Sequence, residues 1–185
     1  MATPLPRGLM TLADWEALPE DNSAHYELQE GVLVASPRPA KPHQQAMFLL
    51  AMQIHPQLPE GWLHLEDFEV VVRSGPLPIV RAPDLVIVRS DCGHARAQVD
   101  EVLLVVEIIS PGSRNVDTHL KAFEYAEAGI PHYWLVDLDP PVPTITVFGL
   151  GAPGDGYVES QTASGVLVVE EPFPLRVDVA ALTPG

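Results

Sequence analysis

Cysteine, membrane-length apolar runs and positive charge are all scarce in this sequence. Cys92 is the single cysteine, so the chain cannot form an internal disulfide. No apolar run approaches the roughly 20 residues that a membrane-spanning helix needs, so we expect no membrane partner. Residues 1–15 lack the basic start and apolar block of a secretory signal. These absences together favour a cytoplasmic location.

Lysine and arginine number 10 against 25 acidic residues, which gives a net charge of −15. Non-specific affinity for nucleic acid comes mainly from basic side chains that neutralise phosphates, so this charge argues against strong non-specific DNA binding. Acids gathered round a metal ion are largely neutralised once the ion binds, and a divalent ion can itself bridge to phosphate. The charge therefore does not exclude DNA as a substrate.

The 185 residues fit a single domain, 1–185, which can bury about 70% of its unfolded surface. Periodicity, capping residues and turn residues predict strands that alternate with helices along the chain. The predicted helices are 11–18, 43–58 and 113–128, and the predicted strands are 25–29, 32–36, 62–73, 85–88, 102–109, 132–136, 143–148, 157–161, 166–170 and 175–179. Residues 74–83 are predicted to be a loop. This order predicts a mixed α/β (α+β) fold, with one mixed sheet flanked by helices and additional N- and C-terminal strands.

The helix predicted over 113–128 has two distinct faces. On a helical wheel Val116, Leu120 and Phe123 form an apolar stripe, which we expect to face the core. Asp117, Lys121 and Tyr125 lie about 100° round from that stripe, on a polar face that flanks the core.

Two acids stand at the ends of the best-supported buried strands. Asp84 directly precedes one strand, and Glu107 lies near the end of the continuous apolar run 102–109. A charge in a strand that is buried on both faces is costly unless it has a partner. Adjacent strands would bring both carboxylates to one end of the sheet, where they suit Mg²⁺, with Mn²⁺ as an alternative.

Simpler explanations remain for each of these acids. Asp84 could cap exposed amides at the strand entry, and Glu107 could pair with an arginine such as Arg81 or Arg114. Glu27, on the polar face of the strand 25–29, is either a surface acid or a ligand.

The neighbouring polar residues also allow two interpretations. Lys121 either supplies positive charge to the site or pairs with Asp117 on a solvated helix face. His43 either has a structural role at a helix start or contacts phosphate or positions a metal-bound water. Tyr125 is expected to pack and to hydrogen-bond an acid.

An ordered set of short motifs spans most of the chain. Its residues are Tyr26-Glu27-Leu28 with Gly31, Pro42-His43, Pro83-Asp84, Val106-Glu107-Ile108 with Ser110-Pro111, Asp117, Lys121, Tyr125, Ala128-Gly129, and Tyr133-Trp134-Leu135-Val136-Asp137. This set resembles the Uma2 family of restriction-endonuclease-like PD-(D/E)XK nucleases. The Pro-Asp pair alone has no specificity, whereas the ordered set is specific.

The resemblance implies a metal-dependent DNA phosphodiesterase fold. It implies that Asp84 and Glu107 are metal ligands, that the carbonyl of Ile108 is a third ligand, and that Glu27 is an outer acid. The superfamily's lysine two residues after the second acid is replaced here by Ile109. By resemblance to Uma2 proteins, Lys121 on the following helix takes over its work.

These observations give a leading hypothesis and two alternatives. The leading hypothesis is a Mg²⁺-dependent DNA endonuclease, in which a metal-bound water attacks phosphorus while Lys121 stabilises the developing charge. The first alternative is a catalytically degenerate nuclease fold that acts as a binding or assembly module. The second is hydrolysis of a smaller phosphorylated substrate. A homodimer is a further expectation, because two sites most easily cut two strands.

Overall fold

The computed structural model describes residues 8–19, 24–36, 38–110, 112–139 and 142–183. Pro111, which belongs to the motif Ser110-Pro111, lies outside the described residues. No helix in these ranges is long and apolar enough to cross a membrane.

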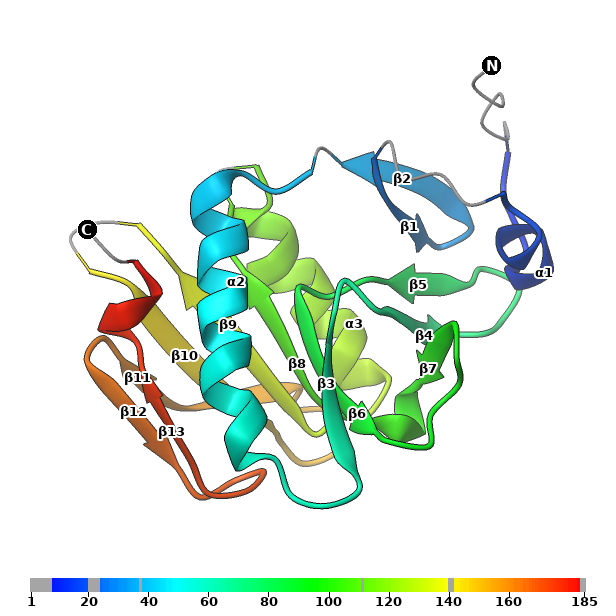
Figure 1. The fold of residues 1–185 in the computed structure, drawn as a ribbon. Helices are drawn as coiled ribbons and strands as arrows, with labels where there is room; N and C mark the ends of the chain where they lie inside the picture. The colour runs from blue at the N-terminus through cyan, green and yellow to red at the C-terminus, as the bar shows by residue number, and fades with distance from the viewer. Residues whose placement is uncertain (1–7, 20–23, 37, 111, 140–141, 184–185) are drawn as a thin grey trace.

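The centre of the molecule is a six-stranded mixed sheet in the order β11-β10-β9-β8-β6-β3 (Figure 1). Only β8 and β9 pair in parallel, and the other neighbours are antiparallel. Its strands are β3 (Trp62–Glu66), β6 (Leu85–Arg89), β8 (Val102–Ile108), β9 (His132–Asp137), β10 (Thr144–Leu150) and β11 (Tyr157–Ala163).

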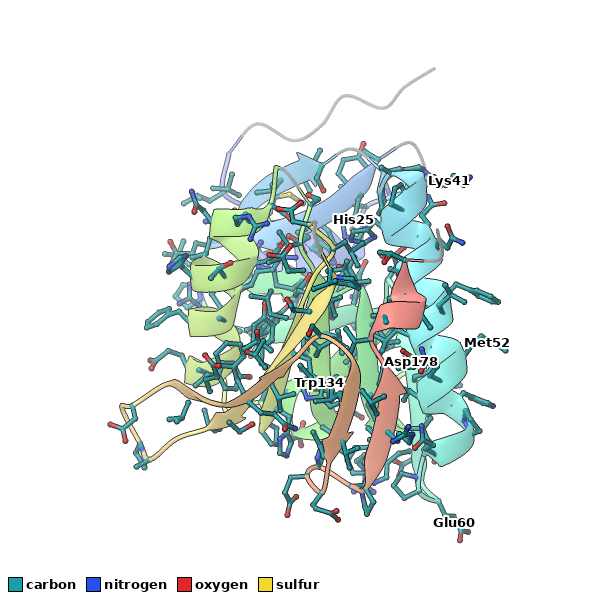
Figure 2. All side chains as sticks on the ribbon, turned by 90° about the vertical axis from the view of Figure 1, so that its left-hand side faces the viewer. His25, Lys41, Met52, Glu60, Trp134 and Asp178 are labelled. Atoms are coloured by element: carbon teal, nitrogen blue, oxygen red, sulfur yellow. The ribbon has the colours of Figure 1, made fainter. Side chains whose placement is uncertain are left out.

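Helices cover both faces of this sheet. On one face α2 (Lys41–Ile54) packs through Ala46, Leu50 and Ile54 against alternate residues of the central strands. On the other face lie a π-helical turn (Val116–Lys121) and α3 (Ala122–Glu127). Figure 2 shows that Met52 of α2 projects away from the body of the protein, whereas Trp134 of β9 lies in its interior.

A second mixed sheet has five strands in the order β2-β1-β5-β4-β7. Its strands are β1 (His25–Gln29), β2 (Val32–Ser36), β4 (Glu69–Arg73), β5 (Ile79–Arg81) and β7 (Arg96–Gln98), and the short helix α1 (Leu12–Glu16) precedes them. Between β1 and β2, Glu30 and Gly31 have φ of 50° and 78°, as in the type I′ turns that match strand twist. The predicted hairpin is therefore confirmed.

The remaining elements complete the C-terminal part of the chain. A two-stranded hairpin of β12 (Val166–Val169) and β13 (Leu175–Asp178) packs on the α2 face. Single 3₁₀ turns occur at His55–Gln57, Val99–Glu101 and Ala180–Leu182. The predicted mixed α/β fold with additional N- and C-terminal strands is confirmed, but its strands divide into two mixed sheets and a hairpin rather than one sheet.

Two strand predictions were wrong in detail. The run 62–73 is two strands, because Asp67 has a φ of 51° and turns the chain from the six-stranded sheet into the five-stranded one. An aspartate adopts this left-handed conformation more readily than most residues, so the break carries no glycine signal. The predicted loop 74–83 contains β5, which is only three residues long.

The predicted orientation of the helix after β8 was also wrong. Val116 is 36% exposed and Phe123 is 63% exposed, while Asp117, Lys121 and Tyr125 are buried. The prediction assumed that apolar side chains face the core and that the segment is α-helical throughout. The first part is instead a π-helix, whose wider turn changes the positions of its side chains, and its buried polar groups have partners.

Candidate active site

Asp84 and Glu107 meet at the end of the antiparallel pair β6–β8. The register pairs Leu85 with Val106, so the ladder places Asp84 beside Glu107 one step further on. Asp84 Oδ2 accepts hydrogen bonds from the backbone N–H of Ile108 at 2.6 Å and from His43 Nε2 at 3.1 Å. The prediction that the two acids share one end of the sheet is therefore matched by the geometry, while their catalytic roles stay predictions.

Glu107 is the most deeply buried of these acids, with 2% of its surface exposed. Its Oε1 accepts from Lys121 Nζ at 3.0 Å and from the Tyr125 hydroxyl at 2.8 Å. Burial raises the pKa of Glu107 well above its usual range. The nearby Lys121 ammonium opposes this shift, and the charge of Asp84 adds to it.

Lys121 reaches the acids from the π-helical turn on the neighbouring face. Its Nζ lies 3.0 Å from Glu107 Oε1, 3.2 Å from Glu27 Oε1 and 3.6 Å from Asp117 Oδ1. Burial alone would lower the pKa of this amine, but the surrounding carboxylates outweigh it and raise the pKa above the ordinary value. Lys121 is therefore a buried, permanently charged ammonium rather than a residue on a solvated helix face.

Ile109 occupies the position at which the superfamily pattern has its lysine. Its side chain is buried in the apolar cluster beneath the helix that carries Lys121. The amine of Lys121 contacts the second acid directly, so the positive charge expected at residue 109 reaches the site from a different element. This is the arrangement that the resemblance to Uma2 proteins implied.

Glu27 joins this group to a second buried ion cluster. Its Oε2 accepts from Arg81 NH1 at 2.9 Å, while its Oε1 faces Lys121. Although burial alone would raise it, the pKa of Glu27 is lowered by Lys121 and Arg81. The alternative of a surface acid is thus wrong, and Glu27 contacts the Lys121 amine, as Asp117 does.

Arg81 completes the second cluster with Glu124. Its Nε donates to Glu124 Oε2 at 2.7 Å and its NH2 donates to Glu124 Oε1 at 2.9 Å. Arg81 has no exposed surface, and its guanidinium does not pair with Glu107. Arg114 instead pairs with Asp137 and Asp139, so the arginine alternative for Glu107 is excluded by geometry. We call Arg81, Glu27 and Glu124 the Arg81 cluster.

The sequence interpretation missed the part played by Arg81 and Glu124. Glu124 is three residues after Lys121, so the helical wheel places it on the same face as Asp117 and Lys121, and that signal was available. Arg81 gave no comparable signal, because β5 is too short to show periodicity.

Asp84, Glu107, Asp117 and Lys121 form what we call the Lys121 cluster. With the Arg81 cluster it brings together five buried carboxylates and two permanent cations. Burial raises the pKa of Asp117, as it does that of Glu107. The hydrogen bonds engage Oδ2 of Asp84 and Oε1 of Glu107, which leaves the second oxygen of each without a donor in the part of the chain that the structure describes.

This excess of negative charge and these unused oxygens fit a divalent cation. Hard cations are bound by carboxylate and carbonyl oxygens and complete their coordination with water. Within the described ranges, however, no three His, Cys, Asp or Glu side chains are grouped closely enough to hold a metal by themselves. Binding of a divalent cation therefore depends on the carboxylates of Asp84 and Glu107 together with the carbonyl of Ile108.

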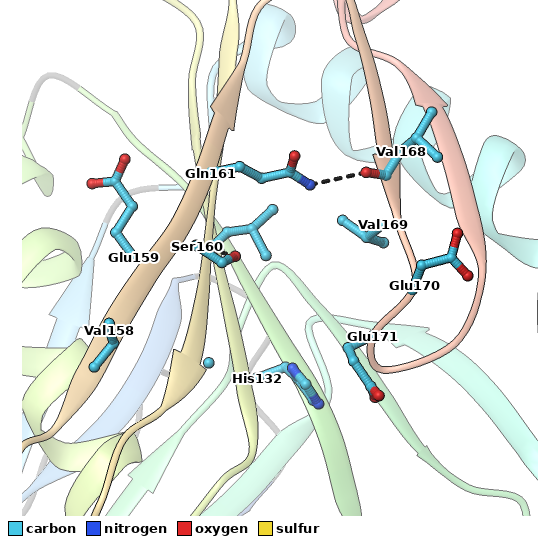
Figure 3. A pocket seen from close by; sticks show the side chains of 11 residues that line it. His132, Val158, Glu159, Ser160, Gln161, Val168, Val169, Glu170 and Glu171 are labelled. Atoms are coloured by element: carbon cyan, nitrogen blue, oxygen red, sulfur yellow. Dashed lines mark hydrogen bonds between the residues drawn. The ribbon is translucent and has the colours of Figure 1, made fainter.

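A separate pocket of about 520 Å³ lies between the edge strand β11 and β12 (Figure 3). It is lined by His132, Ser160 and three glutamates, among others, and the Gln161 amide spans it to donate to the Val168 carbonyl at 3.0 Å. None of the residues that line it belongs to the Lys121 or Arg81 cluster. The pocket is thus distinct from the candidate site.

The fold matches that of a solved structure described as a "putative nuclease belonging to DUF820" from Anabaena variabilis. The TM-score is 0.65 with 17% sequence identity, and the match covers 94% of this chain and 97% of the other. This protein, with its two mixed sheets and small number of helices, therefore has the same fold as that solved structure.

The chain belongs to the Uma2 family, whose description is "Putative restriction endonuclease"; the family pattern matches residues 12–182. No protein with a curated description matches the chain. The resemblance deduced from the ordered motifs is thus confirmed.

Proposed function

We propose that this protein is a metal-dependent endonuclease that hydrolyses phosphodiester bonds in DNA. The observation that carries the proposal is the convergence of Asp84, Glu107 and the Lys121 ammonium in one buried group with more negative than positive charge. Membership of a family described as "Putative restriction endonuclease" supports the choice of DNA as the substrate.

In this proposal Asp84, Glu107 and the Ile108 carbonyl would hold Mg²⁺ or Mn²⁺. When bound, such an ion lowers the pKa of water and neutralises charge on a phosphoryl transition state. Lys121 adds a fixed positive charge beside Glu107, where it can stabilise negative charge that develops on the phosphate. Glu27 and Asp117 hold its amine in place, and the Tyr125 hydroxyl orients Glu107.

The test is cleavage of supercoiled and linear DNA with Mg²⁺ or Mn²⁺ by the wild type and by variants. Asp84→Asn and Glu107→Gln should abolish cleavage, and Lys121→Met should lower the rate about 10²–10³-fold. Matched controls are Asp91→Asn and Lys41→Met, since Asp91 and Lys41 are exposed and lie outside both clusters. Circular dichroism verifies folding in each case. A wild type that binds the metal but cuts no DNA would refute the proposal.

The second candidate is a degenerate nuclease fold that serves as a binding or assembly module. Its support is that Lys121 already has three carboxylate partners, and that the described residues include no ready group of three metal-binding side chains. The same metal-bound but inactive wild type would favour this function.

A further inference from the structure

The pocket between β11 and β12 has the form of an opened hairpin (Figure 3). The two strands are joined by Ser164 and Gly165 alone, a link as short as that of a tight β-hairpin. They nevertheless do not pair, since β11 belongs to the six-stranded sheet and β12 pairs with β13. Counted outward from the link, residues 158–161 stand opposite residues 168–171, and all of them line the pocket. We call these two segments the arms.

The strand edges around this hairpin are closed to different degrees. On the outer edge of β13, the side-chain amides of Gln53 and Gln57 each donate to and accept from the backbone of one residue. On the edge of β12 that faces β11, the Gln161 amide supplies one hydrogen bond, to the Val168 carbonyl at 3.0 Å. An unpaired strand edge is a template for pairing with another extended segment. The space between the arms is therefore the less protected edge of this hairpin.

Negative charge on the arms has no matching cation. Glu159, Glu170 and Glu171 line the pocket, and none of them forms an ion pair with a residue that the structure describes. The sequence has no lysine or arginine from residue 122 to residue 175. His132 also lines the pocket, but burial lowers the pKa of its ring against the opposing charge of Glu171, so it adds no permanent positive charge. The pocket therefore attracts a cationic partner.

The pocket has the length and volume for a short extended segment. Strand residues advance about 3.3 Å each, so the four residues of each arm span roughly 13 Å. The volume of about 520 Å³ falls in the range of roughly 300–1,000 Å³ that is usual for ligand pockets. Val158 and Val168, one on each arm, are 55% and 53% exposed and offer apolar contact. A segment of about four residues therefore fits between the arms.

We propose that this pocket binds an extended basic segment of a partner protein, which adds a strand between β11 and β12. In this mode of recognition, main-chain hydrogen bonds to a strand edge supply affinity and alternate side chains supply specificity. The segment alternates lysine or arginine with apolar residues, so that its cations meet the glutamates and its apolar groups meet the valines.

The charge of the pocket disfavours other occupants. A second copy of this chain carries a net charge of −15, and a nucleic acid brings phosphates that the three glutamates repel. The inference is independent of the proposed endonuclease, because no residue that lines the pocket belongs to the Lys121 or Arg81 cluster.

The experiment titrates the whole protein with terminally blocked peptides that alternate lysine or arginine with valine, such as Lys-Val-Arg-Val-Lys. Calorimetry should show binding that weakens as the salt concentration rises. Hydrogen exchange should slow at backbone amides of the arms when peptide is added, because these amides gain partners, and should not change in α2. This part needs no substitution and so does not depend on whether a variant folds.

A modified peptide separates strand addition from simple attraction between charges. The same peptide with methylated backbone nitrogens keeps its side chains but cannot donate to a strand edge, so it should not bind measurably.

A double variant tests the role of the glutamates. Glu170→Gln with Glu171→Gln should weaken binding about fivefold, since an exposed ion pair contributes at most a factor of about five. Glu60→Gln with Asp100→Asn is the matched control, because it removes the same charge from exposed positions that do not line the pocket. This control should bind the peptide as the wild type does.

Four results would overturn the inference. The site does not exist if none of the basic peptides binds, or if Glu-Val-Glu-Val-Glu binds equally well. Equal binding of the methylated peptide would reduce the interaction to charge attraction, and an equal loss in the control variant would make it non-specific. Self-association of the protein that protects the arms without peptide would assign the pocket to a second copy. DNA cleavage is measured separately, so each of these results leaves the proposed function standing.

Discussion

The Arg81 and Lys121 clusters are neighbours, both are buried, and both contact Glu27, yet they differ in how well their charges are matched. Three nitrogens of Arg81 donate to Glu27 and Glu124, and both oxygens of Glu124 are used. In the Lys121 cluster one amine faces Glu107, Asp117 and Glu27 at once, and the ion pair that Asp84 forms among the described residues is with His43, which is charged only when protonated.

This difference separates a structural ion cluster from a candidate site. Buried ion pairs with complete hydrogen bonding hold elements together, and many of them have no catalytic role. A buried group with surplus negative charge and unused oxygens instead lowers the stability of the metal-free fold and favours binding of a cation. Charge imbalance is therefore a better indicator of a site here than burial of charge.

The largest expected effect is the loss of stability in Arg81→Met. The substitution leaves Glu27 and Glu124 without their shared cation, and removing one partner of a buried pair costs about 3–5 kcal/mol. The free energy of unfolding in urea measures the effect. Arg89→Met is the control, because Arg89 pairs with Asp91 in an exposed position, and its unfolding midpoint should not move. Equal effects of the two substitutions would remove the distinction between the clusters.

A smaller effect of opposite sign is expected for Glu107→Gln in the metal-free protein. The glutamine keeps a carbonyl oxygen for Lys121 and Tyr125 but removes one negative charge from the surplus. We expect a gain in the free energy of unfolding on the order of 1 kcal/mol near neutral pH. Calorimetry or urea unfolding in the presence of a chelator measures it. Destabilisation by this substitution would mean that the Lys121 cluster is balanced after all.

The pH dependence of stability follows from the same group. A carboxyl whose pKa is raised in the folded state binds its proton more tightly there than in the unfolded chain, where the ordinary value is 4.5. Stability of the metal-free protein should therefore fall as pH rises from that value through the raised pKa of Glu107. Glu107→Gln should flatten this slope at pH values above 4.5. Glu27 has a lowered pKa and acts in the opposite sense, because its contribution is lost only on acidification.

Much of the site could be predicted because it depends on local patterns. Apolar runs identify β6 and β8 as buried strands, and their pairing brings Asp84 to Glu107. Lys121 could be assigned because it is one of two lysines and the motif order fixes its place. None of these steps requires knowledge of which face a helix buries.

The parts that could not be predicted depend on partners far apart in the sequence. Arg81 is separated by 54 residues from Glu27 and by 43 from Glu124, and only the folded chain reveals these pairs. Until such partners are known, a helical wheel cannot separate a buried Lys121 from one that pairs with Asp117 on a solvated face. The polar face was therefore predicted only to flank the core, and the solvated pair stayed open as an alternative, although each of its charges has a buried partner.

The smallest expected effect tests directly whether the apolar stripe of the helix after β8 faces solvent. Phe123 is largely exposed, so Phe123→Ser should change the free energy of unfolding by no more than about 0.5 kcal/mol, the usual range for surface substitutions. Phe173→Ser is the matched substitution in the core, where loss of a buried phenylalanine costs about 3–5 kcal/mol. Urea unfolding of both variants gives the comparison. If Phe123→Ser cost nearly as much as Phe173→Ser, the apolar stripe would have to face the core. Lys121 would then point away from Glu107, because one helix cannot bury both faces against the same sheet.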